Sequence, residues 1–161
     1  MAKPGHNGRR VGGMRAGKRW QELAQAGDPG SVRSLAWAYL ERLLAQNYTE
    51  RTASARCQDL ARFAAWCEER GIVRPAEISR PMLERFQRHL FHYRKANGAP
   101  LTVGRQVSFL QSVQGFFRWL ARENQITGNP AADLVLPRRP GRQLREPLSV
   151  AEVEQVLSLL D

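Results

Sequence analysis

Residues 102–120 read TVGRQVSFLQSVQGFFRWL. Apolar residues recur in this stretch at steps of three and four, the spacing that gathers side chains on one face of an α-helix. The sequence therefore predicts an amphipathic helix that begins at Thr102. Three aromatic residues lie off the main apolar face of this helix: Phe109, Phe116 and Trp119. Aromatic residues at helical spacing usually pack in the core, but these three are also candidates for a second interface.

Three more amphipathic helices are expected on the N-terminal side of this one. Thr49 is a candidate N-cap, and Gly71 is a typical helix stop. No alternation of apolar and polar residues is long enough to build a sheet, so the chain is predicted to be all-α, a four-helix bundle. The three helical runs cover residues 31–46, residues 49–70, and a run from Ser79 to Asn97 and Gly98.

The composition divides the chain into four parts. Residues 1–30 hold seven of the thirteen glycines and six Lys or Arg, which predicts a flexible basic arm. The bundle is expected over residues 31–136, and residues 137–147, rich in Pro, Gly and Arg, are expected to be an extended linker. Residues 148–161 would be the first helix of a missing catalytic domain, with Ser149 and Glu152 as a capping box. The alternative is that this last helix folds back on the bundle.

Charge and cysteine usage narrow the class of protein. The formal net charge is +10, which favours a polyanionic partner because clustered cations displace counterions from phosphates, although a merely basic protein remains the simpler alternative. Cys57 and Cys67 match neither a disulfide framework nor a zinc site and are expected to be reduced core residues. With neither a membrane span nor a secretion signal, we expect a cytoplasmic protein.

No catalytic constellation is evident in the sequence. It has no Walker-type glycine loop, no H-E-x-x-H, and no nucleophile with a base at a usable spacing. His89 and His92 lie three residues apart but lack a third ligand, so a solvated or phosphate-facing pair is the preferred interpretation over a metal site. We therefore expect no cofactor and no catalysis by this chain.

Two predicted helix starts combine a threonine with an arginine. Free backbone N–H groups and the positive end of the macrodipole favour an anion at such a position, and nearby hydroxyl and guanidinium donors add to this preference. For either helix alone, ordinary capping with a solvated arginine explains the same residues. The predicted phosphate contacts are Thr49, Arg51, Thr52, Thr102 and Arg105.

Further polar residues are expected on the exposed faces of the same two helices and in the linker. Short or forked polar side chains can reach base edges in a DNA major groove. The predicted base readers are Arg56, Gln106 and Ser108, with Arg62, Gln111 and Ser112 on the same faces. The linker arginines would form a strap along the phosphate backbone: Arg138, Arg139 and Arg142.

Two segments resemble the N-terminal core-binding domain of Xer-type tyrosine recombinases and phage integrases. The first runs from Thr52 through Asp59 to Trp66, and the second runs from Val113 through FFRWL to Asn129, Pro130 and Ala131. The resemblance implies a SAM-like bundle that clamps one face of a double-stranded DNA recombination half-site. It also implies contacts with other protomers on DNA, and a tyrosine nucleophile in a C-terminal domain that this chain lacks.

Three rival functions remain at this point. A helical protein-interaction module predicts self-association through Phe109 and Trp119 and no salt-sensitive DNA binding. A helix-turn-helix regulator is disfavoured by the long connection from Gly71 to Ser79. A complete small nuclease would require metal-dependent cleavage by the chain itself.

Overall fold

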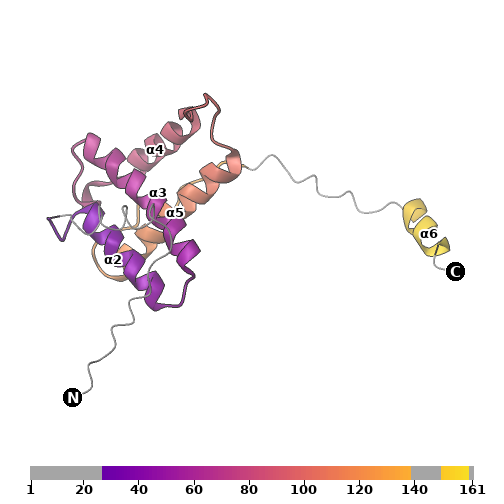
Figure 1. The fold of residues 1–161 in the computed structure, drawn as a ribbon, viewed down its shortest axis with the longest axis horizontal. Coiled ribbons are helices and arrows are strands. Elements are labelled where there is room, and N and C mark those ends of the chain that lie inside the picture. Colours follow the sequence, from indigo (N-terminus) through magenta and orange to yellow (C-terminus); the bar gives the residue numbers. More distant parts are fainter. Residues whose placement is uncertain (1–26, 139–149, 160–161) are drawn as a thin grey trace, which may run out of the picture.

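The computed structural model describes residues 27–138 and 150–159. Within these residues it is helical, with no β-strand, and it confirms the predicted all-α bundle of four helices (Figure 1). None of the described helices is long and apolar enough to cross a membrane. The bundle helices are α2 (Val32–Ala45), α3 (Glu50–Glu69), α4 (Arg80–His92) and α5 (Val103–Arg122), with a 3-10 turn at Pro75–Glu77 and a further helix α6 (Val150–Ser158).

The predicted N-caps and the predicted stop of α3 are confirmed. Thr49 and Thr102, the predicted starts of α3 and α5, each accept a hydrogen bond from a backbone N–H in the first turn of the helix that follows. Ser31, for which no cap was predicted, does the same for α2. Gly71, with φ of +71°, ends α3: its N–H donates to Glu68 O, and the N–H of Ile72 donates to Cys67 O. These two bonds form a Schellman motif, which favours glycine because its left-handed backbone carries no Cβ penalty.

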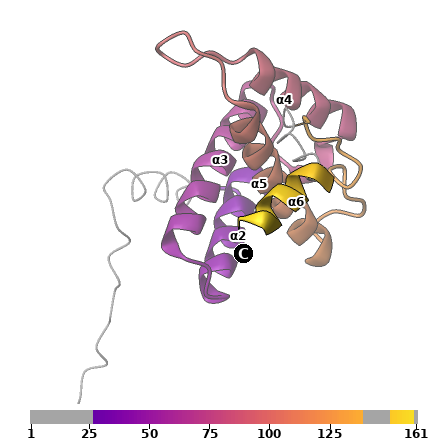
Figure 2. The ribbon, with the colours of Figure 1, turned by 90° about the vertical axis from the view of Figure 1, so that its right-hand side faces the viewer.

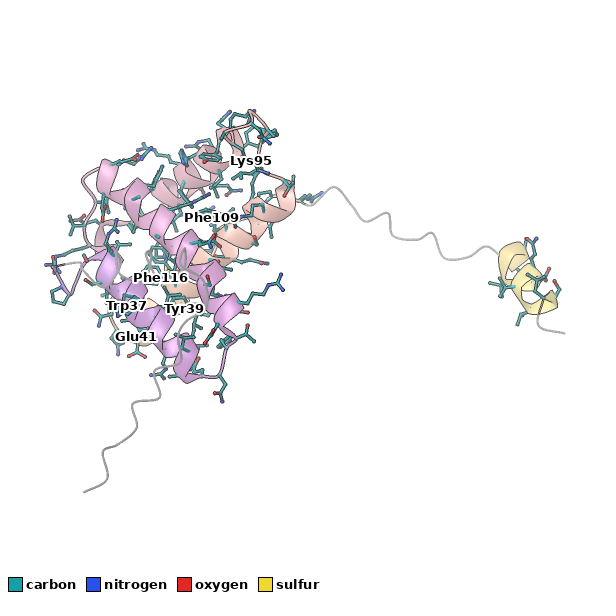
Figure 3. The ribbon with its side chains drawn as sticks, viewed as in Figure 1. Trp37, Tyr39, Glu41, Lys95, Phe109 and Phe116 are labelled. Atoms are coloured by element: carbon teal, nitrogen blue, oxygen red, sulfur yellow. The ribbon has the colours of Figure 1, made fainter. Side chains whose placement is uncertain are left out.

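The predicted end of α4 at Asn97 and Gly98 is wrong. The helix ends at His92, because no buried apolar residue follows Leu90 in the helical register. The chain then turns back in a loop in which the N–H of Gly98 donates to Lys95 O at 2.8 Å (Figure 3). Gly98, with φ of +81°, therefore serves a turn between two extended segments and not a helix C-cap.

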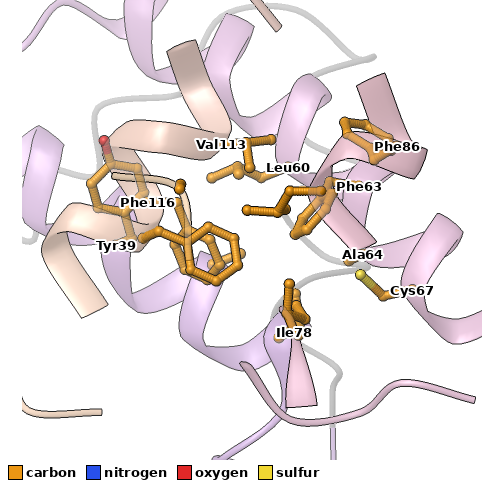
Figure 4. Close-up of a cluster of buried hydrophobic side chains, with 14 of the residues drawn as sticks. Tyr39, Leu60, Phe63, Ala64, Cys67, Ile78, Phe86, Val113 and Phe116 are labelled. Atoms are coloured by element: carbon orange, nitrogen blue, oxygen red, sulfur yellow. The ribbon is translucent and has the colours of Figure 1, made fainter. Parts of the chain in front are cut away.

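The core is built around aromatic rings contributed by α3, α4 and α5 (Figure 4). The ring of Phe63 lies 5.0 Å from that of Phe86 and 6.0 Å from that of Phe117, in edge-to-face geometry in both pairs. Cys57 and Cys67 are both buried, as expected of core cysteines. The helices α3 and α4, expected to be amphipathic, each bury an apolar face: Leu60, Phe63, Ala64, Cys67, Leu83, Phe86 and Leu90.

Two of the three aromatics proposed for a second interface are core residues instead. Phe109 and Phe116 are only 2% and 0% exposed, whereas Trp119 is half-buried and packs on the ring of Tyr39 at 5.6 Å. The reason is the position of α5, which packs against α2, α3 and α4 and so buries more than one of its faces (Figures 1 and 2). Self-association through Phe109 is thereby excluded.

Several predicted features lie outside the described residues. These are the first 26 residues of the basic arm predicted over residues 1–30, most of the linker with Arg139 and Arg142, and the capping residue Ser149. Helix α6 is present, and its apolar side chains are exposed to solvent: Val150, Val153, Val156 and Leu157.

Candidate nucleic-acid interface

The starts of α3 and α5 are capped by threonine in the same way. Thr49 Oγ1 accepts the N–H of Thr52 at 3.2 Å, and Thr102 Oγ1 accepts the N–H of Arg105 at 3.1 Å. Each cap satisfies one of the free N–H groups at its helix start and leaves the positive end of the helix dipole facing solvent. Both threonines are therefore structural caps, and both residues are exposed, with an arginine within the next three positions of the chain.

A groove between α3 and α5 gathers five of the predicted DNA-binding residues. It has a volume of about 530 Å³ and is open to solvent. Arg51, Thr52 and Arg56 line it from α3, and the residues that line it from α5 include Arg105 and Ser108. The remaining lining residues are Ala55, Gln58, Asp59, Gln111 and Ser112.

A buried carboxylate forms part of the groove's lining. Asp59 is 4% exposed, and its Oδ1 lies 2.5 Å from Nη2 of Arg105. Its Oδ2 accepts a hydrogen bond from the hydroxyl of Ser112 at 2.8 Å. Each oxygen of the buried carboxylate thus has a donor, the condition under which a buried charge is tolerated.

Arg56, which also lines the groove, is held by a hydrogen bond to α2. Its Nη1 donates to the hydroxyl of Tyr39 at 3.1 Å. Burial raises the pKa of Tyr39, and the charge and hydrogen bond of Arg56 act against this rise. The tyrosine therefore remains a neutral hydroxyl at physiological pH and holds the arginine by its oxygen.

Three polar residues expected on the DNA-facing sides of α3 and α5 are not free to read bases from the groove: two of them are engaged inside the protein, and the third lies elsewhere. Gln106 is buried, and its Nε2 donates to Leu101 O at 3.1 Å, so its amide is engaged inside the protein. Ser112 is buried as the partner of Asp59. Arg62 is exposed and borders a different recess, beside His89 and Tyr93.

The linker strap can be located only at its first residue. Arg138 is exposed, and it follows a segment held to the bundle by two glutamine side chains. Nε2 of Gln87 donates to Val135 O at 3.0 Å, and Nε2 of Gln114 donates to Leu134 O at 3.4 Å. Arg139 and Arg142 fall beyond the described part of the chain.

Sequence reasoning assigned no role to Asp59, Tyr39 as a polar partner, or Gly115. The signal for Asp59 was available: it lies four residues before Phe63 and seven before Trp66, on a face that the period of the helix buries. A carboxylate at such a position needs a cationic partner. Which arginine supplies it depends on how α3 crosses α5, and a single sequence does not reveal that angle.

No metal-binding cluster is found among the described residues. Within residues 27–138 and 150–159 no three side chains of His, Cys, Asp or Glu come together in a way that would hold an ion. His89 and His92 are both exposed on α4. The ring of His89 lies 6.2 Å from that of Tyr93 and 6.1 Å from that of Phe86.

Comparison with known proteins identifies the class to which this fold and groove belong. The family model described as phage integrase, N-terminal SAM-like domain, matches residues 36–127. The chain belongs to this family.

Two relatives and one solved structure agree with the assignment. Tyrosine recombinase XerC 2 of Ralstonia nicotianae is 52% identical over 124 residues, which is 77% of this chain and 36% of the relative. Tyrosine recombinase XerD of Pseudomonas putida is 30% identical over 123 residues, which is 76% of this chain and 37% of the relative. The matched region thus spans little more than a third of the length of these recombinases.

The structural neighbour supports the fold. The N-terminal domain of a phage integrase/site-specific recombinase from Haloarcula marismortui superposes with a TM-score of 0.57 at 18% identity. The superposition covers 66% of this chain and 96% of the neighbour. The bundle is therefore homologous in sequence to the N-terminal region of tyrosine recombinases and shares the fold of an integrase N-terminal domain.

Proposed function

We propose that this chain is the DNA-binding core domain of a site-specific tyrosine recombinase, and that it holds one face of a double-stranded recombination half-site. The observation that carries the proposal is the groove between α3 and α5. Its lining includes residues from the first turns of both helices together with three arginines, Arg51, Arg56 and Arg105, against the single carboxylate of Asp59.

The chemistry of the groove suits a phosphate backbone beside an accessible base edge. The capped helix starts favour negative charge, and Arg51 is exposed where it can follow a phosphate. Arg56 and Ser108 lie further along the two helices and present polar groups of the kind that read bases in the major groove. Thr49 and Thr102 are exposed at the starts of the same two helices.

The cutting step is proposed to belong to another part of the protein. The two relatives are named as tyrosine recombinases, and the matched region is about a third of their length. We place residues 31–136 as the DNA-binding domain, residues 137–147 as a linker whose arginines follow the backbone, and residues 148–161 as the start of the catalytic domain. Such a recombinase would act in the cytoplasm and contact other protomers on the same DNA.

A salt titration tests the proposal directly. The chain is titrated against a fluorescently labelled duplex at several salt concentrations, and the logarithm of affinity is expected to fall steeply and linearly with the logarithm of salt. Arg51→Ala should reduce the magnitude of this slope by about one, the expectation for one lost phosphate contact.

Arg122→Ala is the matched control, because it removes the same charge from an exposed position at the far end of α5. It should leave the slope close to that of the unaltered chain. A flat salt response of the unaltered chain, or an equal effect of the two substitutions, would contradict the proposal.

A further inference from the structure

The side chain of Arg105 is held in place before any ligand arrives. Its Nη2 is 2.5 Å from Oδ1 of Asp59, and its Nη1 lies 3.4 Å from the hydroxyl of Ser108. Its guanidinium carbon lies 5.1 Å from the centre of the Phe109 ring. Because the Asp59 carboxylate is itself fixed by Ser112 at 2.8 Å, the guanidinium plane is anchored to both α3 and α5.

Arg51 in the same groove is a useful contrast. It is exposed, and it makes no side-chain hydrogen bond or ion pair with any other residue that the structure describes. A free, hydrated cation of this kind gains free energy by displacing counterions from a phosphate. Arg105 gains less by that route, since a buried carboxylate already balances its charge.

The contact with Asp59 fixes the orientation of the Arg105 guanidinium and adds no positive charge to the groove. An arginine that reads a base must present its planar N–H fork in one direction, and holding it there in advance reduces the side-chain entropy lost on binding. The Arg105 side chain is 35% exposed and borders the groove, so donors not used by Asp59 and Ser108 remain accessible. The base edge that matches this fork is guanine, whose O6 and N7 accept two parallel hydrogen bonds.

We propose that Arg105 is a specificity-determining residue that reads a guanine in the major groove, and that Asp59, held by Ser112, is its positioning residue. This inference rests on the proposed function and goes further, because it assigns base recognition to a residue whose position at a helix start predicts a phosphate contact. It makes the buried carboxylate of α3 part of DNA recognition.

The test is a selection from a pool of randomised duplexes, followed by affinity measurements on the selected duplex and on its single base-pair variants. The unaltered chain should select a site with a G·C pair at one fixed position. Arg105→Lys keeps the charge but loses the fork, so discrimination at that position should fall about 5- to 150-fold, with the salt slope unchanged. Asp59→Asn and Ser112→Ala should relax the same position and no other.

Arg51→Ala is the control for a phosphate contact. It should lower affinity for all duplexes alike, reduce the salt slope, and leave the base preference intact. Thermal unfolding of each variant checks that it is folded. If another variant fails to fold, Ser112→Ala still tests the inference, because it leaves the charges of Asp59 and Arg105 in place.

The outcomes separate this inference from the proposed function. If the unaltered chain binds duplex DNA without base preference, or if Arg105→Lys keeps every preference, the inference is wrong and the DNA-binding function stands. The same holds if Arg105→Lys weakens binding evenly across sequences. If the unaltered chain shows no salt-dependent binding to any duplex, the proposed function itself fails.

Discussion

The hydroxyl of Tyr39 accepts its hydrogen bond from Arg56 directly over Gly115 of α5. A Cβ built on Gly115 would lie 2.8 Å from the Tyr39 oxygen and 2.9 Å from Nη1 of Arg56. Tyr39 has little room to yield, because its ring is buried and packs against Phe116 at 5.8 Å. The glycine therefore permits a contact between α2 and α3 to pass across the face of α5.

Gly115→Ala is expected to destabilise the bundle by about 1–2 kcal/mol. The alanine gains about 1 kcal/mol of helix propensity, but it displaces the Tyr39 hydroxyl and overpacks its surroundings, which costs more. The measurement is the free energy of unfolding in denaturant.

Gly104→Ala is the control for this substitution, because a Cβ there meets nothing within 4 Å. It should be neutral or stabilising by up to about 1 kcal/mol. Equal stability of the two alanine variants would show that the crowding at Gly115 is absent.

The two threonine caps allow folding and DNA binding to be separated. Aspartate caps a helix as well as threonine does and interacts favourably with the helix dipole, so Thr49→Asp and Thr102→Asp should keep the unfolding free energy within about 0.5 kcal/mol. A carboxylate at either position would repel a phosphate, so DNA affinity should fall. Alanine at the same positions should cost about 1 kcal/mol of stability.

Unchanged DNA affinity of both aspartate variants would place the phosphates elsewhere. The unfolding free energy is measured by denaturant unfolding, and the DNA affinity is measured by a duplex titration at one salt concentration. Serine at each position is the control, because it keeps the hydroxyl, the cap and the charge.

Local sequence signals predicted the elements well and their packing poorly. Helix ends are marked by Thr49, Thr102 and Gly71. The hydrogen bonds that cap these ends join residues close together in the chain, so they can be predicted from a single sequence. The burial of Phe109 and Phe116 was misjudged because α5 packs against three other helices and so buries more than its main apolar face, and that depends on the arrangement of those helices.

The groove was predicted in the same partial way. Five of its lining residues follow from the two helix starts and their exposed faces. Gln106 was expected on the exposed face of α5, yet it is buried and its amide donates to the carbonyl of Leu101. The pairing of Asp59 with Arg105 joins residues 46 positions apart, so only the folded arrangement of α3 and α5 reveals it.

The acid side of the stability profile should depend on His89. Its pKa is lowered, first by partial desolvation of the ring and then by the positive charge of Arg70, while Glu69 acts in the opposite direction. The unfolded chain therefore takes up a proton below about pH 6.5 that the folded chain resists, so stability should fall as pH decreases through this range.

Arg70→Gln should raise the pKa of His89 and weaken that pH dependence. The pKa is followed by the histidine ring signals in an NMR titration, and stability by denaturant unfolding at several pH values. Arg122→Gln is the control for a general loss of positive charge. If the pKa of His89 is unchanged in Arg70→Gln, the guanidinium of Arg70 does not contribute to the lowering of that pKa.

Cys67 should react with thiol reagents only through unfolding. Burial raises the pKa of its thiol to about 12, so the thiolate is scarce as well as inaccessible. Labelling with an aromatic disulfide should be slow in water and rapid in denaturant. Because the folded pKa lies above the ordinary value of 9.0, stability should be retained below pH 9 and lost as pH rises toward 12. Rapid labelling without denaturant would contradict the buried position.

Helix α6 provides a test of how the chain is divided. It has nine residues and an apolar side made of Val153, Val156 and Leu157, all of them exposed. An isolated helix of this length is marginal in water, so its backbone amides should exchange with solvent much faster than those of α3 and α5. Hydrogen exchange followed by mass spectrometry of peptides from both regions makes the comparison within one sample. Fast exchange of α6 would support the proposal that its partner surface is supplied by a catalytic domain. Protection equal to that of α5 would mean that α6 folds back on the bundle. The proposed boundary at residue 148 would then be wrong.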